Sequence, residues 1–125
     1  AVKDYCNSIT KTHALQINYS SFGMENFNAE INISVTVYRV IQELINNTMK
    51  HAKATESIVQ IANDNNILHI TVEDNGKGFD VKNMNQFKGA GWTNIQNRIN
   101  YLKGKIEIES SEEHGTSIII EIPLT

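Results

Sequence analysis

The sequence predicts an α+β fold in which an antiparallel or mixed sheet carries helices on one face. Apolar residues recur at helical spacing in two long segments, residues 34–51 and 93–103. Strand-like segments instead come in neighbouring pairs, 57–62 with 67–74 and 105–110 with 116–122. Because such pairs form hairpins, this order argues against a doubly wound parallel sheet.

The first elements are expected before residue 52. Residues 2–11 predict a short helix, and residues 13–19 alternate weakly, as a strand would. Residues 34–51 predict the clearest helix, with Ser34 as its N-cap. One side of that helix gathers its apolar periodic positions, which are Tyr38, Ile41, Leu44, Ile45 and Thr48.

The second half predicts two strand pairs around a helix. Residues 57–62 and 67–74 read as strands joined by the polar segment 63–66, and residues 80–90 are polar with little periodicity. In the helix predicted over 93–103, Ile95, Ile99 and Leu102 form one stripe, and Gly104 is the expected C-terminal stop. Residues 105–110 and 116–122 are the closing strands.

The composition indicates one soluble domain. Residues 1–125 suffice for a single hydrophobic core, and the start without Met suggests a piece of a longer protein. No apolar run could span a bilayer, and no signal segment is present. A net charge of −3 and a pI of about 5.8 argue against a general nucleic-acid surface. The single Cys6 cannot form an internal disulfide.

Asp74 is the first candidate site residue. Side chains alternate along a strand, so Asp74 falls on the apolar face of Leu68, Ile70 and Val72. A buried carboxylate is costly unless donor groups bind to it. Asp74 is therefore a candidate for holding the donor groups of a ligand.

The long helix carries a polar stripe of Arg39, Glu43, Asn47 and Lys50, with His51 at its end. Residues three and four apart lie on one helix face. The stripe is either a solvated face with an Arg39–Glu43 pair or a row of ligands along a cleft. In the second case the oxygen ligands suit Mg²⁺, and Lys50 suits a phosphate.

Glycines bracket the polar segment 79–90. Gly76 and Gly78 precede it, and Gly89 and Gly91 end it just before a predicted helix, whose N-terminus attracts phosphate. The segment is either a flexible lid over a nucleotide or an ordinary surface loop.

Thr116 resembles Asp74 in its placement. It shares a face with Ile118, Ile120 and Ile122 and stands one step beyond this apolar run. Asp74 and Thr116 could therefore grip one ligand at the same edge of the core. The alternative is that Thr116 is a strand residue bonded to backbone.

Four motifs in this order resemble the ATP-binding domain of bacterial sensor histidine kinases, in the superfamily shared with gyrase, Hsp90 chaperones and MutL mismatch-repair proteins. Residues 38–47 with 50–52 are similar to the N box, in the Gln-Glu form of the nitrate-sensor-like subgroup. Residues 74–79 resemble the G1 box and residues 89–98 the G2 box, although Trp92 stands where Leu is usual. Residues 115–117 resemble the final glycine motif.

The resemblance implies a two-layer α/β sandwich, the Bergerat ATP-binding fold, with ATP between the N-box helix and the lid. By it, Asp74 accepts from the adenine amino group, with help from Thr116 directly or through water. Asn47 binds Mg²⁺, Glu43 completes the metal shell or positions groups, and Lys50 meets phosphate. The expected catalytic residues are Glu43, Asn47 and Lys50, and the expected nucleotide or metal contacts are Glu43, Asn47, Lys50, His51, Asp74, Gly76, Gly78, Gly89, Gly91 and Thr116.

The function that the resemblance implies is donation of the γ-phosphoryl group of ATP to a histidine on a separate dimerisation domain. That domain, which is missing here, and a response regulator are the expected partners. We expect the isolated domain to be a cytoplasmic monomer of low turnover that contacts neither nucleic acid nor membrane, even if the parent protein is membrane-anchored.

Two other functions remain open. A standalone serine kinase and anti-sigma factor of the same superfamily would use a protein serine as acceptor, and the Gln-Glu form of the N box argues against it. A nucleotide-sensing module would bind without catalysis. The joint presence of Glu43, Asn47, Lys50 and Asp74 argues against that loss of catalysis.

Overall fold

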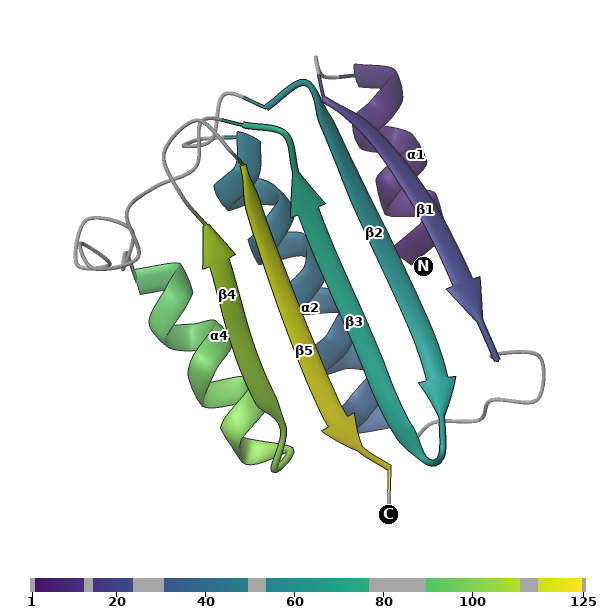
Figure 1. Ribbon diagram of the computed structural model, residues 1–125, viewed down its shortest axis with the longest axis vertical. Coiled ribbons are helices and arrows are strands. Elements are labelled where there is room, and N and C mark those ends of the chain that lie inside the picture. The colour runs from purple at the N-terminus through teal and green to yellow at the C-terminus, as the bar shows by residue number, and fades with distance from the viewer. Residues whose placement is uncertain are drawn as a thin grey trace.

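The computed structural model describes residues 2–12, 15–23, 31–49, 54–76, 90–110 and 115–124. These residues form two layers, a five-stranded sheet and a layer of helices (Figure 1). In chain order the elements are α1 (Val2–Thr12), β1 (Gln16–Phe22), α2 (Ile31–Asn47), β2 (Glu56–Asp64), β3 (Ile67–Asp74), α4 (Ala90–Tyr101), β4 (Lys105–Ser110) and β5 (Thr116–Pro123).

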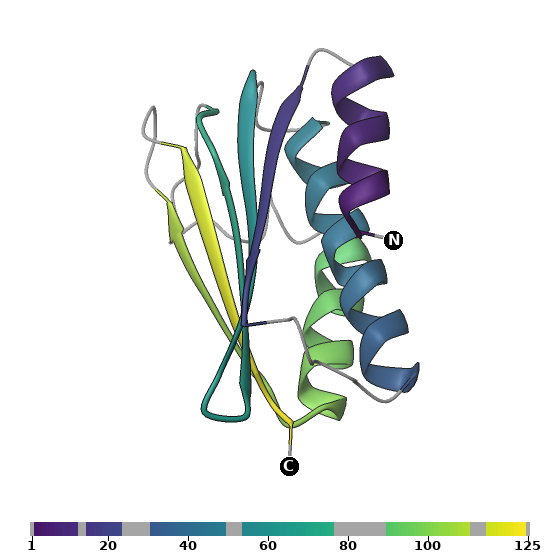
Figure 2. The ribbon, with the colours of Figure 1, turned by 90° about the vertical axis from the view of Figure 1, so that its right-hand side faces the viewer.

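The sheet is mixed, with the strand order β1-β2-β3-β5-β4. β1 pairs with β2 in parallel, and the other three pairs are antiparallel. Figure 2 shows α1, α2 and α4 together on one side of the sheet. The predicted α+β sandwich with helices on one face is therefore confirmed.

The β2–β3 hairpin turns at Asn65 and Asn66. Both residues have positive φ, 53° and 59°. A two-residue turn with positive φ at both positions matches the twist of the strands that it joins, and Asn tolerates this conformation better than most residues do. The predicted connection over 63–66 is thus shorter than expected, because both strands extend into it.

α2 begins earlier than the sequence analysis predicts. It starts at Ile31, so Ser34 is an exposed residue within the helix and the N-cap assignment is wrong. The apolar period also extends further back, since Ile33 packs against the core one turn before the buried Val37. The regular helix ends at Asn47 and continues as a π-helical turn at residues 48–49.

α4 ends in a Schellman motif. The N–H of Gly104 donates to the Ile99 carbonyl and the N–H of Lys103 donates to the Asn100 carbonyl, both at 2.9 Å. The left-handed residue is Lys103, with φ 59°, rather than the predicted stop Gly104. Gly104 is needed for another reason, since a Cβ there would lie 2.7 Å from the Glu121 carbonyl oxygen.

The hydrophobic core fills the space between the sheet and the helices. Along β3 the side chains alternate between this core and the opposite face. Fully burying an aliphatic side chain contributes roughly 1.5–3 kcal/mol. The largest fully buried side chains are Val40, Ile41, Leu44, Ile45, Val59, Leu68, Ile70, Ile95, Ile99, Ile120 and Ile122, together with Cys6.

Trp92 also belongs to the core. Only 2% of its surface is exposed, so the large ring at the start of α4 points inward. Of the helices in the described ranges, none combines the length and the apolar character that a membrane span requires.

Candidate functional site

A row of polar side chains crosses four strands at one end of the core. Asp74, the last residue of β3, lies opposite Ser57 of β2 and Thr116 of β5, and Thr116 lies opposite Ser110 of β4. Cross-strand partners point to the same face, and Asp74 continues the buried line of Val72. The row therefore lies on the helix-covered face. The structure brings Asp74 and Thr116 together, as their strand positions predict.

The Asp74 carboxylate is held by neutral donors. Its Oδ1 accepts a hydrogen bond of 2.8 Å from the Gly76 N–H, which forms an Asx turn. Burial raises the pKa of the Asp74 carboxyl above its ordinary 3.8, and hydrogen bonds from the N–H groups of Gly76 and Thr116 and from the Thr48 hydroxyl offset part of this rise. None of these partners is a cation. Asp74 thus retains acceptor capacity for the donor groups of a ligand.

Gly115 and Ser110 fix the position of Thr116. Gly115 has φ 79°, and a Cβ there would collide with the Asp74 carbonyl oxygen. The Ser110 hydroxyl donates to the Gly115 carbonyl at 3.0 Å and lies 3.0 Å from Thr116 Oγ1. The buried Thr116 hydroxyl therefore lies within hydrogen-bond distance of the Ser110 hydroxyl. The alternative prediction was a hydrogen bond from Thr116 to backbone.

Asn75 ties the start of β2 to the end of β3. Its Oδ1 accepts from the N–H groups of Thr55 (2.9 Å) and Glu56 (3.0 Å), and its Nδ2 donates to Thr55 Oγ1 (3.0 Å). The Thr55 carbonyl accepts in turn from the Gln16 N–H, which extends the link to β1. These bonds hold the backbone between Asp74 and Gly76 in place.

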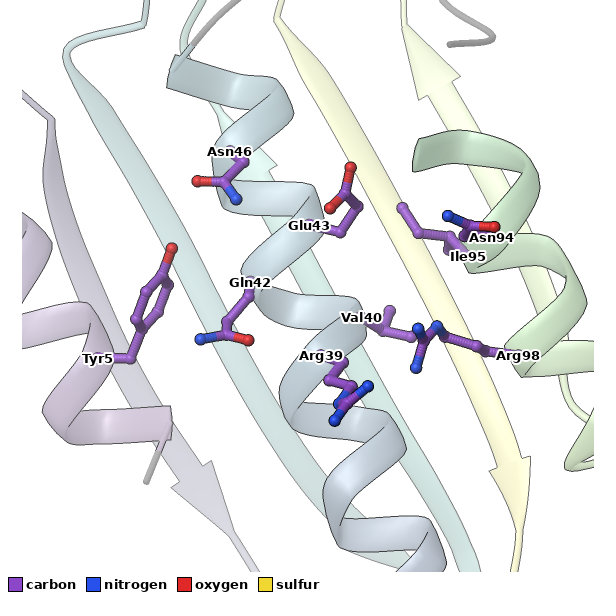
Figure 3. A pocket seen from close by; sticks show the side chains of 9 residues that line it. All are labelled: Tyr5, Arg39, Val40, Gln42, Glu43, Asn46, Asn94, Ile95 and Arg98. Carbon is purple, nitrogen blue, oxygen red and sulfur yellow. The ribbon is translucent and has the colours of Figure 1, made fainter. Parts of the chain in front are cut away.

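A groove of about 490 Å³ lies between α1, α2 and α4 (Figure 3). Arg39 and Glu43 of the predicted polar stripe line it, so this part of the stripe faces a groove. In the part of the chain that the structure describes, no ion pair joins Arg39 to Glu43. Asn47, half-buried, lies one helical turn beyond Glu43 at the end of α2. Asp74 does not line the groove.

Of the four glycines predicted to belong to the site, two lie in the described ranges and two lie outside them. Gly76 is buried and donates to Asp74. α4 begins at Ala90, three residues before the predicted start, so Gly91 lies in its first turn and not in the connection before it. The remaining predicted site residues, which lie outside the described ranges, are Lys50, His51, Gly78 and Gly89.

Three residues that support the site were not predicted from the sequence. Thr48 was assigned to the apolar stripe of α2, but its hydroxyl donates to the Leu44 carbonyl at 3.1 Å and also affects the Asp74 carboxyl. Ser110 stands one step beyond the partly buried Ile108 on β4, the same pattern that singled out Thr116, so the sequence carried that signal. The role of Asn75 depends on a contact with residues 55 and 56, which no local pattern shows.

The fold and the polar row together define a class of protein, an α+β sandwich with a partly buried carboxylate at the end of a central strand. The model of the family described as histidine kinase-, DNA gyrase B-, and HSP90-like ATPase matches residues 32–125, and the chain belongs to this family. The match includes Asp74, Thr116 and all of α2 from its second residue onward.

Two of the curated relatives are named as histidine kinases. The chain is 32% identical over 125 residues to the signal transduction histidine-protein kinase/phosphatase DegS of Brevibacillus brevis, covering 99% of this chain and 32% of that protein. It is 31% identical over 129 residues to the oxygen sensor histidine kinase NreB of Staphylococcus carnosus, covering all of this chain and 36% of that protein. The chain thus spans about a third of the length of these two relatives.

Solved structures share the fold. The blue-light activated histidine kinase of Erythrobacter litoralis EL346 superposes with a TM-score of 0.78 at 19% identity, over 98% of this chain and 39% of that one. The histidine kinase AdeS of Acinetobacter baumannii gives a TM-score of 0.76 at 17% identity, over 99% of this chain and 61% of that one.

Proposed function

We propose that this chain is the ATP-binding catalytic domain of a sensor histidine kinase. It binds ATP with Mg²⁺ and donates the γ-phosphoryl group to a histidine on a separate dimerisation domain. The observation that carries the proposal is the pairing of Asp74 with Thr116 at the end of the sheet, in a chain that belongs to the ATPase family. The names of DegS and NreB, both histidine kinases, support the choice of a histidine acceptor.

Asp74 and Thr116 recognise the adenine base in this proposal. The adenine amino group donates, and the carboxylate of Asp74 accepts without a competing cation. Thr116 assists through its hydroxyl, directly or through a water. Gly76 keeps the Asp74 carboxylate oriented by its N–H, and Asn75 fixes the backbone on both sides of that turn.

Glu43 and Asn47 fit a magnesium ion. They lie one turn apart on α2 and offer carboxylate and amide oxygens, which Mg²⁺ prefers. Mg²⁺ commonly takes one or two protein ligands and completes its shell with phosphate oxygens and water. When bound, the metal would offset the negative charge of the phosphates.

The transfer itself depends on positioning. The bond between the γ-phosphorus and the oxygen of ADP breaks as a bond to the imidazole nitrogen of the acceptor forms. Glu43 positions these groups in the proposal, while Lys50 and His51 meet the phosphates. The glycines Gly76, Gly78, Gly89 and Gly91 shape and hinge the lid. The dimerisation domain and a response regulator are the proposed partners, so little turnover is expected from this chain alone.

Thermal unfolding with and without ADP and Mg²⁺ tests the nucleotide site. A ligand at about 100 times its dissociation constant adds about 2.7 kcal/mol of stability, which raises the midpoint by several degrees. The Asp74→Asn variant should lose most of this rise, because an amide presents donor hydrogens where the adenine amino group also donates.

Glu73→Gln is the matched control. Glu73 is the neighbouring carboxylate on the same strand, but it is exposed on the opposite face. This variant should keep the full rise in midpoint. No rise at millimolar ADP in a well-folded wild-type sample, or an undiminished rise in Asp74→Asn, would reject the proposed nucleotide site.

A further inference from the structure

The groove between α1, α2 and α4 carries an unusual pair of cations. Arg39 reaches into it from α2 and Arg98 from α4, and Figure 3 shows the two guanidinium groups turned toward each other. Within the described ranges neither is paired with a carboxylate. Among the described residues that line the groove, Glu43 is the single acidic side chain beside two arginines, so these residues carry a net positive charge on a protein whose net charge is −3.

Two converging guanidinium groups suit a carboxylate. Both cations line one groove, so an anion bound there would be attracted by both. The planar fork of arginine matches the two oxygens of a carboxylate and forms paired, charge-assisted hydrogen bonds with it. The groove also offers amide groups from Gln42 and Asn94 as further partners.

The position of the arginines separates them from the proposed phosphate contacts. Along α2, Arg39 precedes Glu43 by one turn, about 6 Å, and Asn47 by two turns, about 12 Å. Phosphates held at Asn47 would therefore leave the arginine pair open. An anion at the arginines would instead lie about one turn from Glu43, where the proposed transfer takes place.

We propose that this groove is the docking site of the histidine-bearing acceptor domain, which it holds through an acidic side chain of that domain. The inference rests on the proposed function and adds the surface by which the acceptor is recognised. The spacing points to a helical segment of the acceptor with a carboxylate one turn from the histidine. When the carboxylate meets Arg39 and Arg98, the histidine lies beside Glu43.

The test uses the histidine domain of the parent kinase, added in trans at varied concentration to the chain with ATP and Mg²⁺. The double variant Arg39→Ala/Arg98→Ala should raise the KM for the acceptor domain about tenfold or more, because two charge-assisted contacts are lost. The wild-type KM should rise with ionic strength, and the KM of the double variant should respond much less.

Lys105→Ala is the matched control, since Lys105 is an exposed cation on β4. Its KM for the acceptor domain should stay at the wild-type value. The rise in unfolding midpoint with ADP, measured on the same samples, should be equal in the wild type and in the double variant.

Each other outcome decides against the docking role. An unchanged KM in the double variant would overturn it. A lost response to ADP in that variant would assign the arginines to the nucleotide instead. No ADP response in the wild type itself would reject the proposed function, which is a separate result.

Discussion

At the scale of single residues, Asp74 is the clearest compromise between stability and function. Its carboxylate is half-buried at the edge of the core, where hydrogen bonds from neutral groups only partly offset the cost of desolvation. In the proposed function, hydrogen bonding to the adenine base offsets this cost.

The free energy of unfolding should depend on pH because of the desolvation cost of the Asp74 carboxylate. Because the pKa of Asp74 is raised on folding, the folded state holds the proton more tightly than the unfolded state does. The contribution of Asp74 is then most favourable below pH 3.8 and is lost as the pH rises through the folded-state pKa. Relative to Asp74→Asn, which does not titrate, the wild type should gain unfolding free energy as the pH falls from 7 toward 4.

Urea titrations of both proteins at several pH values would measure this difference. A difference that stays constant over this range would mean that the Asp74 carboxyl titrates alike in the folded and unfolded chains. A change of opposite sign would mean that its donors outweigh the effect of burial.

The sequence identified Asp74 and Thr116 because each is a polar residue one step beyond an alternating apolar run. That pattern follows from the two-residue period of a strand and needs no knowledge of neighbouring strands. The hydrogen bonds that hold them could not be predicted in the same way. Asn75 contacts residues 20 positions earlier, and Thr48 acts on Asp74 from a helix.

At the scale of elements, two neighbouring residues at the end of α4 have different structural roles. Lys103 carries the left-handed backbone of the Schellman motif, and Gly104 packs its backbone against Glu121 of β5. The sequence predicts Gly104 for the left-handed position, because glycine is the usual residue there. Lys103 adopts the left-handed conformation at some cost in strain. The glycine is instead needed at position 104, where a side chain would not fit.

Substitutions at these two positions should therefore have opposite effects. Lys103→Gly should raise the unfolding free energy by about 0.5–1 kcal/mol, because it relieves the left-handed strain. Gly104→Ala should lower it by about 1–3 kcal/mol, because the new Cβ would meet the Glu121 carbonyl at 2.7 Å. Chemical denaturation of both variants checks the pair. Equal effects would show that the backbone at the end of α4 rearranges to accept either residue.

The boundaries of α2 and α4 were harder to predict than their existence. Each helix begins three residues before its predicted start, and the predicted stripes include the buried Ile41, Leu44, Ile45, Ile95 and Ile99 but omit Val37, Val40 and Trp92. Local capping signals such as Ser34 are weak when the first turn can still place a residue like Ile33 against the core. Packing energy then outweighs a cap of about 1 kcal/mol.

At the scale of the whole molecule, one core is shared by the sheet and all three described helices. Cys6 of α1 is fully buried in it, and burial raises the pKa of its thiol to about 11. Tyr5 beside it packs edge-on against Tyr38 of α2, with ring centroids 6.1 Å apart. α1 should therefore leave the core only when the whole domain unfolds.

Alkylation of Cys6 measures this coupling. The thiolate is the reactive form, so iodoacetamide at pH 8 should modify the native protein far more slowly than the unfolded chain. Across a urea titration, the modified fraction by mass spectrometry should follow the loss of circular dichroism. Rapid modification at urea concentrations where the sheet is intact would show that α1 detaches by itself.

The arrangement of strands was only partly predictable. Hairpin pairs and helices on one face follow from local patterns, and both are present. The parallel β1–β2 pair and the insertion of β5 between β3 and β4 join distant segments, and periodicity says nothing about which distant strands meet.

The β3–β5 pairing determines when during folding the proposed ligand site is completed. The β2–β3 hairpin closes through a two-residue turn, whereas Glu73 and Ser117 of β3 and β5 are 44 residues apart in sequence. Closing long loops costs more entropy, and distant pairings form more slowly. Asp74 can thus have Ser57 beside it long before Thr116 arrives on its other side. In the proposed function, the nucleotide site is therefore complete only after β5 has paired with β3.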